Sequence, residues 1–204
     1  MNYLPQTSMT ARSTNWTVVA ISVMAIALFH ILTLYPQPTI DGVRLALRGT
    51  ALTTALPFLL FFVARPLILV NRPLTHWVQS YRPELWLVLT ASHLIHLYEI
   101  RVYYQLGQQC PLAIWLATIP VWGITVFFAI LVIIRPAWFE QTSFTRQKWM
   151  FRIGLTYVWL IFTTAFGLGT IAQHLLLYNM PFFILFLAGG ALHGMAWFKF
   201  DDRH

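Results

Sequence analysis

Six long apolar segments, separated by short polar stretches, make up most of the chain. Each holds enough residues to cross the hydrocarbon core of a bilayer, which is roughly 30 Å thick, at a rise of about 1.5 Å per helical residue. The expected limits of the segments are 16–35, 43–70, 84–106, 112–134, 148–173 and 181–198. This pattern predicts an all-α fold, with one integral membrane domain over 1–204 that consists of a six-helix bundle.

Prolines and glycines refine this prediction. Pro181 is expected to open the last segment, because proline is common where a helix starts. Pro57 and Pro120 lie inside segments, where they predict kinks covered by neighbouring helices. Gly190 and Gly194 form a G-x-x-x-G pair, which we expect to serve close helix packing within the bundle.

The positions of the basic residues predict the orientation of the bundle. The chain has 13 lysines and arginines, and only 9% of its residues are charged. With the N-terminus inside, only Arg44, Arg48 and Arg101 fall in outer segments. The positive-inside rule then places both termini in the cytoplasm. We interpret the net charge of +7 as suited to anionic lipid headgroups, and we expect no nucleic-acid partner.

Histidines inside the predicted segments are the main candidates for function, because ionisable groups are costly in hydrocarbon. His93 and His96 are three residues apart, on roughly the same helix face. His96 lies about 18 Å from the inner end of its segment and His30 about 21 Å from the inner end of its own, so they are nearly level. Level histidines on facing helices can bind one b-type haem iron from opposite sides. Alternatively, each histidine only hydrogen-bonds a neighbouring helix.

The residue inventory argues against a self-contained catalytic site. The chain has six acidic residues and one cysteine, Cys110. No carboxylate-containing metal cluster, cysteine pair or Ser-His-Asp set can be assembled from it. We expect no catalytic residues, and at most a membrane subunit of an oxidoreductase.

Three short motifs resemble the ferric-reductase-like transmembrane family. They are R-G-T-A-L at 48–52 with a later R-P-L at 65–67, R-P-E-L at 82–85 leading to His96, and R-Q-K-W at 146–149 with Tyr157. The first is similar to the family's T-G-R-T-A-L run ending in T-P-L, although the spacing here is longer. The likeness extends from about Arg44 to Gly167. It is nearest to the bacterial branch that supplies electrons to periplasmic methionine sulfoxide reductase.

This resemblance implies a transmembrane electron-transfer subunit in a bacterial inner membrane, with b-type haem as its cofactor. Separate proteins would donate and accept the electrons, because the chain has no G-x-G-x-x-G motif and we expect no flavin or nicotinamide domain. His96 matches a haem-ligand position of the family. Ile153 and Phe166 stand where the family has its two histidines on the 148–173 segment, so both usual partners are missing.

We therefore expect His96 and His30 to ligate the iron. His93 is the reserve ligand, at a lower site shared with His193. By the same resemblance, Arg48 is expected to face the bundle interior and to pair with a haem propionate or with Glu99, because an unpaired guanidinium in lipid is costly. Snorkelling of Arg48 to the outer headgroups is the alternative.

A haem-free interpretation stays open beside the electron-transfer one. In it, the chain is a degenerate family member that acts as a structural or interaction subunit, or as a small-molecule transporter. The transporter interpretation draws on Pro57, Pro120, Glu99 and the Gly167-x-Gly169 pair, which could line a cavity.

Overall fold

The computed structural model describes residues 14–35, 37–64, 66–109, 111–135, 148–172 and 176–201, and within these ranges all regular structure is helical. The elements are α1 (Trp16–Leu34), α2 (Ile40–Val63), the 3-10 turn η1 (Pro66–Leu69), α3 (Arg72–Ser80), α4 (Arg82–Gln105), α5 (Leu112–Ile134), α7 (Lys148–Ala172) and α8 (Leu176–Asp201). The predicted all-α class is confirmed. Cys110 and the 136–147 stretch, with part of the third motif, lie outside the described residues.

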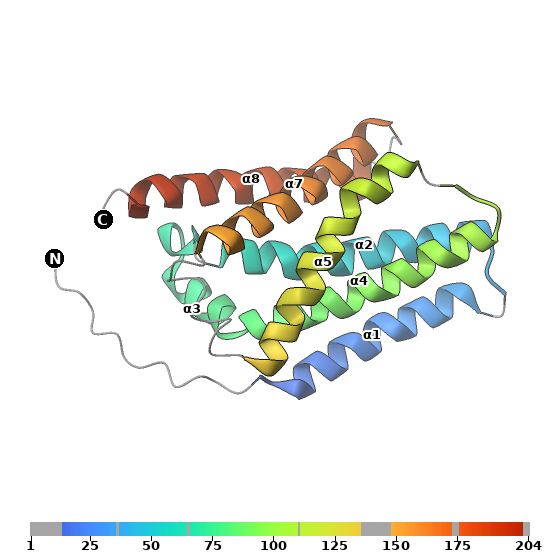
Figure 1. Ribbon diagram of the computed structural model, residues 1–204, viewed down its shortest axis with the longest axis horizontal. Coiled ribbons are helices and arrows are strands. Elements are labelled where there is room, and N and C mark those ends of the chain that lie inside the picture. The colour runs from blue at the N-terminus through green and yellow to red at the C-terminus, as the bar shows by residue number, and fades with distance from the viewer. Residues whose placement is uncertain are drawn as a thin grey trace.

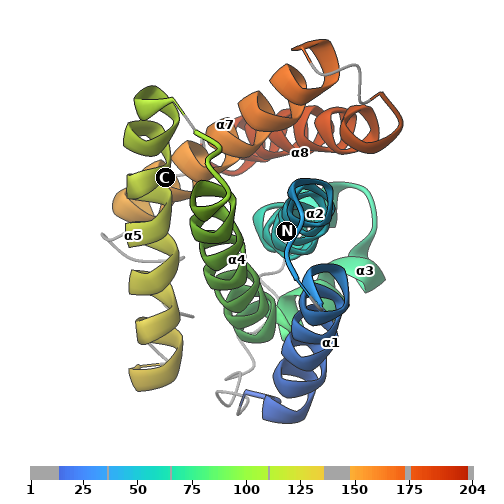
Figure 2. The ribbon, with the colours of Figure 1, turned by 90° about the vertical axis from the view of Figure 1, so that its right-hand side faces the viewer.

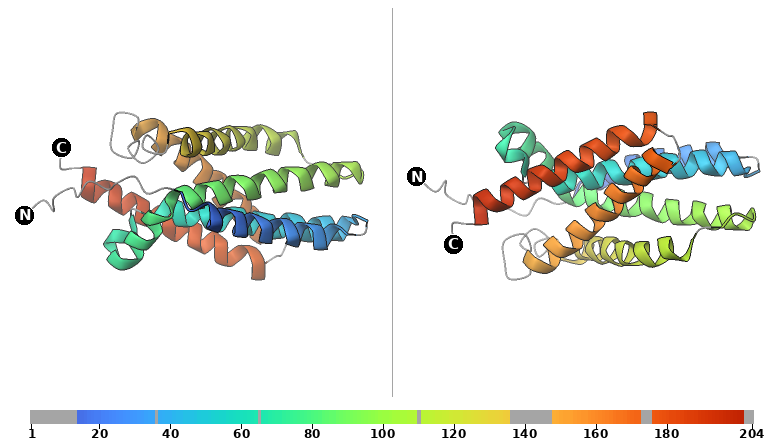
Figure 3. Two further views of the ribbon diagram at one scale, coloured as in Figure 1. Left: turned by 90° about the horizontal axis from the view of Figure 1, so that it is seen from below. Right: turned by 90° about the horizontal axis from the view of Figure 1, so that it is seen from above.

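Helices α1, α2, α4, α7 and α8 run back and forth roughly along the long axis in Figure 1, and α5 crosses α2 and α4 obliquely. The end of the bundle that holds α3 is called the α3 end, and α1 begins and α8 ends there. The opposite end, where α1 ends and α2 begins, is called the far end. Helix α4 packs against α1, α2 and α5, and Figure 2 shows it between α5 on one side and α1 and α2 on the other. The views from below and above keep this order (Figure 3). Helix α4 is therefore the central helix of the group formed by α1, α2, α4 and α5.

Five of the described helices are long and apolar enough to cross a membrane: α1, α2, α5, and the greater part of α7 and of α8. Helix α4, which was predicted as a sixth span, is not among them. Its 24 residues would reach about 36 Å. It carries Glu84, His93, His96, Glu99 and Arg101, however, and these lower its hydropathy. A central helix can hold polar side chains because they face other helices instead of lipid.

Two helix boundaries differ from the predictions. Helix α2 ends at Val63 instead of near residue 70, and η1 follows it. Helix α8 begins at Leu176, so Pro181 lies inside it. A proline lacks the N–H group that would bond to the preceding turn. Near the start of a helix this costs only a single hydrogen bond, so one more turn can precede the proline.

Phenylalanines fill the core between α2, α7 and α8. Stacked ring pairs run through it with centroid separations between 5.3 and 6.2 Å, and the rings are those of Phe58, Phe62, Phe162, Phe166, Phe182 and Phe186. On α8, a Cβ added at Gly190 would lie 2.4 Å from the Trp159 ring of α7, whereas one at Gly194 would meet open space. The first glycine of the G-x-x-x-G pair therefore serves close packing inside the bundle, as predicted.

Helix α1 lies at the edge of the bundle and buries only Val19 and Ile26. Polar contacts join it to α4 near both of its ends. At the α3 end, the backbone N–H of Asn15 donates to Glu84 Oε1 at 2.6 Å. Toward the far end, His30 contacts Glu99. The second of these contacts belongs to the candidate site.

Candidate functional site

Glu99 of α4 is at the centre of a polar cluster in the interior of the bundle, and its side chain is 0% exposed. His30 of α1 places its Nδ1 atom 2.8 Å from Glu99 Oε1. The hydroxyl of Thr50, on α2, donates to the other carboxylate oxygen, Oε2. Three helices thus meet at one carboxylate, which is the arrangement expected of a buried acidic group that needs partners.

His96 completes this cluster from one helical turn before Glu99. Its Nδ1 atom lies 2.8 Å from Thr50 Oγ1 and 3.7 Å from Glu99 Oε2. The side chains of His30 and His96 are 14% and 24% exposed, so they are the parts of the cluster nearest to the surface. We call these four residues, His30, Thr50, His96 and Glu99, the Glu99 cluster.

A row of hydroxyl groups continues from the Glu99 cluster toward the α3 end. Ser92 Oγ lies 2.8 Å from Thr53 Oγ1 and 2.9 Å from Thr54 Oγ1, and it is 3.3 Å from the carbonyl oxygen of Thr50. Helical spacing explains the row: Thr50, Thr53 and Thr54 share one face of α2, and Ser92 shares a face of α4 with Glu99, seven residues later. These two polar faces meet along the α2–α4 interface.

The cluster lies in the far half of the bundle. His30 is four residues before the end of α1, or about 6 Å, and Glu99 is six residues before the end of α4, or about 9 Å. The hydroxyl row extends it inward, since Ser92 is seven residues, or about 10 Å, below Glu99.

The hydrogen atoms of the cluster can be assigned to donors and acceptors. With Glu99 ionised, His30 donates its Nδ1–H to Oε1 and Thr50 donates its hydroxyl hydrogen to Oε2. His96 then donates its own Nδ1–H to the Thr50 oxygen. Every Nδ1–H and hydroxyl hydrogen of the cluster has an acceptor in this state, and the cluster carries a net charge of one negative unit.

The structure brings together the two histidines that were expected to share a haem iron. Both rings direct Nδ1 toward the carboxylate and hydroxyl of the cluster, so in each ring Nε2 is the atom that could ligate a metal. Haem ligation by this pair stays a prediction. In the part of the chain that the structure describes, no three His, Cys, Asp or Glu residues are grouped so that they could hold a metal ion.

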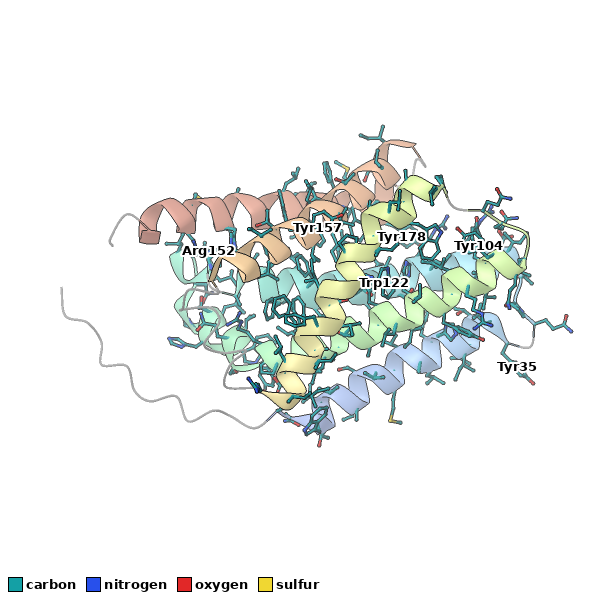
Figure 4. All side chains as sticks on the ribbon, in the orientation of Figure 1. Tyr35, Tyr104, Trp122, Arg152, Tyr157 and Tyr178 are labelled. Atoms are coloured by element: carbon teal, nitrogen blue, oxygen red, sulfur yellow. The ribbon has the colours of Figure 1, made fainter. Side chains whose placement is uncertain are left out.

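His93, the reserve ligand, faces a different interface from His96. It is buried with its ring 3.7 Å from that of Trp122 on α5, midway along the bundle (Figure 4), and among the described residues its Nδ1 atom has no hydrogen-bond partner. His193 stacks on Phe62 at 4.4 Å. Ring contacts lead from Phe62 through Phe58 and Phe162 to His93, and the lower site stays a prediction.

The remaining predicted positions take up other surroundings. Arg48 is exposed, and in the described ranges the structure gives it no ion pair; Glu99 is paired with His30 instead, so the expected inward orientation of Arg48 is not found. Phe166 is buried in the phenylalanine core, and Ile153 is 66% exposed. Neither side chain can ligate iron.

Sequence reasoning missed Thr50 and Ser92 as members of the site and gave Glu99 only minor roles. The spacing held a signal for Glu99, which follows His96 by three residues and therefore lies beside it on the helix. The threonines gave no comparable signal, because a hydroxyl in an apolar helix usually bonds to a carbonyl of its own helix. Thr50 does so with Ala46 and also reaches Glu99.

Comparisons of the chain with models of protein families, with curated proteins and with solved structures found no match.

Proposed function

We propose that this chain is an integral membrane protein that binds and releases a proton at the Glu99 cluster, as a proton relay or a proton-coupled transporter. The observation that carries the proposal is a fully buried carboxylate bonded to a histidine and a threonine, with a second histidine beside it. Ionisable groups held inside a membrane bundle commonly belong to proton or substrate pathways. Of the alternatives that the sequence left open, the haem-free small-molecule transporter is the nearest to this proposal.

Charge balance gives the site a reason to take up a proton. With Glu99 ionised and both histidines neutral, the cluster leaves one negative charge in the bundle interior, which is a costly state. One added proton on the His30–Glu99 pair makes the cluster neutral, either as an ion pair or as two neutral groups. The cluster therefore alternates between two states that differ by a single proton.

The position of the cluster suits a relay. His30 and His96 are its partly exposed members, at 14% and 24%. Toward the α3 end, the hydroxyls of Thr53, Thr54 and Ser92 gather at the carbonyl oxygen of Thr50, and each hydroxyl can accept one hydrogen bond and donate another.

Electron transfer through a haem is the second candidate. Two observations favour it: the motif resemblance, and the buried Nδ1 atom of His93 that lacks a hydrogen-bond partner. Such an atom normally has a partner in a folded protein. His93 is accordingly the residue on which this candidate rests, and His30 and His96 have other partners.

Proton flux into liposomes tests the first candidate. Purified protein is reconstituted around a trapped pH-sensitive dye, and a potassium diffusion potential drives protons inward. We expect wild-type vesicles to acidify faster than empty ones, and Glu99→Gln, which keeps the shape but not the charge, to lose most of the added rate, because an amide cannot bind and release the proton. The matched control is Asp41→Asn, which removes an exposed carboxylate. Equal rates for wild type and Glu99→Gln would contradict the proposal.

An absorption spectrum of the same purified protein, made in haem-sufficient cells, tests the second candidate. A reducible Soret band that disappears in His93→Ala and persists in His30→Ala would favour electron transfer. Folded protein without a Soret band would contradict electron transfer through haem, and proton binding would then be the remaining candidate.

We further propose that the bundle has six spans, α4 included, and that the α3 end faces the cytoplasm of a bacterial inner membrane. The basis is the excess of lysines and arginines in the segments of the α3 end, against Arg44, Arg48 and Arg101 at the far end. A reporter enzyme that works only in the cytoplasm should be active when it is fused after His204. Activity of a reporter that works only outside the cytoplasm, fused at the same position, would show the opposite orientation.

A further inference from the structure

An open pocket lies at the far end of the bundle, and Arg101 in its wall is on the other side of α4 from Glu99, although the wall residue Tyr98 also contacts the ring of His30 at 5.5 Å. Its volume is about 450 Å³, and its walls are Leu97, Tyr98, Arg101 and Tyr104 of α4 with Trp115 of α5. The side chains of Tyr104 and Trp115 are joined by a hydrogen bond in which Nε1 of Trp115 donates at 2.5 Å. Tyr104 lies near the far end in Figure 4. Two aromatic rings fixed in this way form a rigid wall.

The pocket combines one positive charge with mostly apolar walls. Arg101 is exposed, and within the described ranges it has no ion pair. Tyr98 and Tyr104, which also line the pocket, each carry a hydroxyl group. A guanidinium with neighbouring hydroxyls is suited to phosphate oxygens, which it can bind with two parallel hydrogen bonds.

The depth of the pocket matches the headgroup zone of a bilayer. Arg101 is four residues before the end of α4, or about 6 Å, and Trp115 is three residues after the start of α5. Tyrosine and tryptophan are enriched at this depth. Below the pocket, the exposed side chains of Leu94 and Ile119 continue its apolar surface toward the middle of the bundle, since each is one turn from a wall residue.

We propose that this pocket binds an anionic phospholipid, with the phosphate at Arg101 and an acyl chain along Leu94 and Ile119. The apolar continuation selects a lipid over a soluble phosphate, because a small anion would leave these surfaces exposed. This inference is independent of the proton-binding proposal, because Arg101 and Glu99 lie on different sides of α4.

Native mass spectrometry of the detergent-purified protein tests the assignment. Phosphatidylglycerol, phosphatidylcholine and glycerol 3-phosphate are titrated separately against the wild type, Arg101→Gln, Arg101→Lys and Arg44→Gln. Arg44 is the matched control, since it is an exposed arginine at the same end that lies 3.5 Å from Asp41. We expect Arg101→Gln to bind phosphatidylglycerol about fivefold more weakly, the effect of one basic group near an anionic surface, while Arg44→Gln is unchanged. Arg101→Lys, which keeps the charge but not the two parallel hydrogen bonds, should bind with an affinity between those of the wild type and Arg101→Gln.

Three results would overturn the proposal. Equal losses in Arg101→Gln and Arg44→Gln would mean that general surface charge attracts the lipid. Phosphatidylcholine binding as tightly as phosphatidylglycerol would remove the role of the net negative charge. Displacement of the lipid by equimolar glycerol 3-phosphate would show that the pocket takes the free phosphate headgroup.

Discussion

The pair formed by His30 and Glu99 should be energetically coupled, so that removing both side chains costs less than the sum of the two single losses. In Glu99→Ala, the Nδ1–H of His30 loses its acceptor, whereas the hydroxyl of Thr50 keeps the carbonyl oxygen of Ala46. A buried donor without a partner costs about 1–3 kcal/mol, so this single change should reduce the free energy of unfolding by about 2 kcal/mol. His30→Ala should cost less, because Thr50 still bonds to Glu99.

The size of the coupling follows from the environment of the pair. Hydrogen bonds between membrane helices couple by about 0.6 kcal/mol on average and by about 1.7 at most, because the unfolded chain in the membrane also finds partners. The bond here is 2.8 Å long, joins two ionisable groups, and ends on a carboxylate that is 0% exposed. We therefore expect a coupling near the upper limit, about 1.5 kcal/mol.

The assay is a double-mutant cycle on the wild type, His30→Ala, Glu99→Ala and the double variant. Reversible unfolding in mixed micelles of dodecyl maltoside and dodecyl sulfate, followed by helical circular dichroism, gives the four free energies. The exposed Arg44 and Asp41 pair is the control cycle, in which we expect no measurable coupling. A His30–Glu99 coupling below about 0.5 kcal/mol, the usual error of additivity, would refute the reasoning.

Two further predictions concern packing. Gly190→Leu should destabilise the bundle by about 1–3 kcal/mol, because its Cβ alone would lie 2.4 Å from the Trp159 ring, whereas Gly194→Leu meets open space and should change the unfolding midpoint little. Trp86→Ala should cost about 3–5 kcal/mol, because this side chain is 0% exposed and donates to the Thr125 carbonyl oxygen at 3.0 Å, and thermal unfolding of the purified protein measures it. A Gly194→Leu variant as unstable as Gly190→Leu, or a Trp86→Ala variant with the melting temperature of the wild type, would contradict these assignments.

The depth of side chains could be predicted from the sequence, but their partners could not. Counting residues from the segment ends placed His30 and His96 at nearly the same level, and the structure brings both to Glu99. Depth follows from the fixed helical rise, whereas partnership depends on which faces meet. Packing of the whole bundle decides which face of α1 meets α4. The sequence alone therefore did not predict that the Glu99 carboxylate lies between the two histidines.

His93 and His96 show the limit of spacing rules on a central helix. Residues three apart differ by about 60° around the helix axis, which is close enough to share a face on a peripheral helix. Helix α4 has neighbours on more than one side. The same angle therefore sends His96 to the α2 interface and His93 to Trp122 of α5. The polarity that serves these interfaces also explains why α4 falls outside the helices that are apolar enough to span.

Polar bonds join helix α1 to α4 near both of its ends. The Asn15 N–H bonds to Glu84 and His30 bonds to Glu99, and fifteen residues of α4, about 22 Å, separate the two carboxylates. Between them α1 buries only Val19 and Ile26, and near His30 the Phe29 ring packs against Gly49 of α2. A change in protonation at Glu99 would act on the second polar bond alone. The resulting movement of α1 would be a swing about its Asn15 end, and it would first alter the packing of Phe29 on α2.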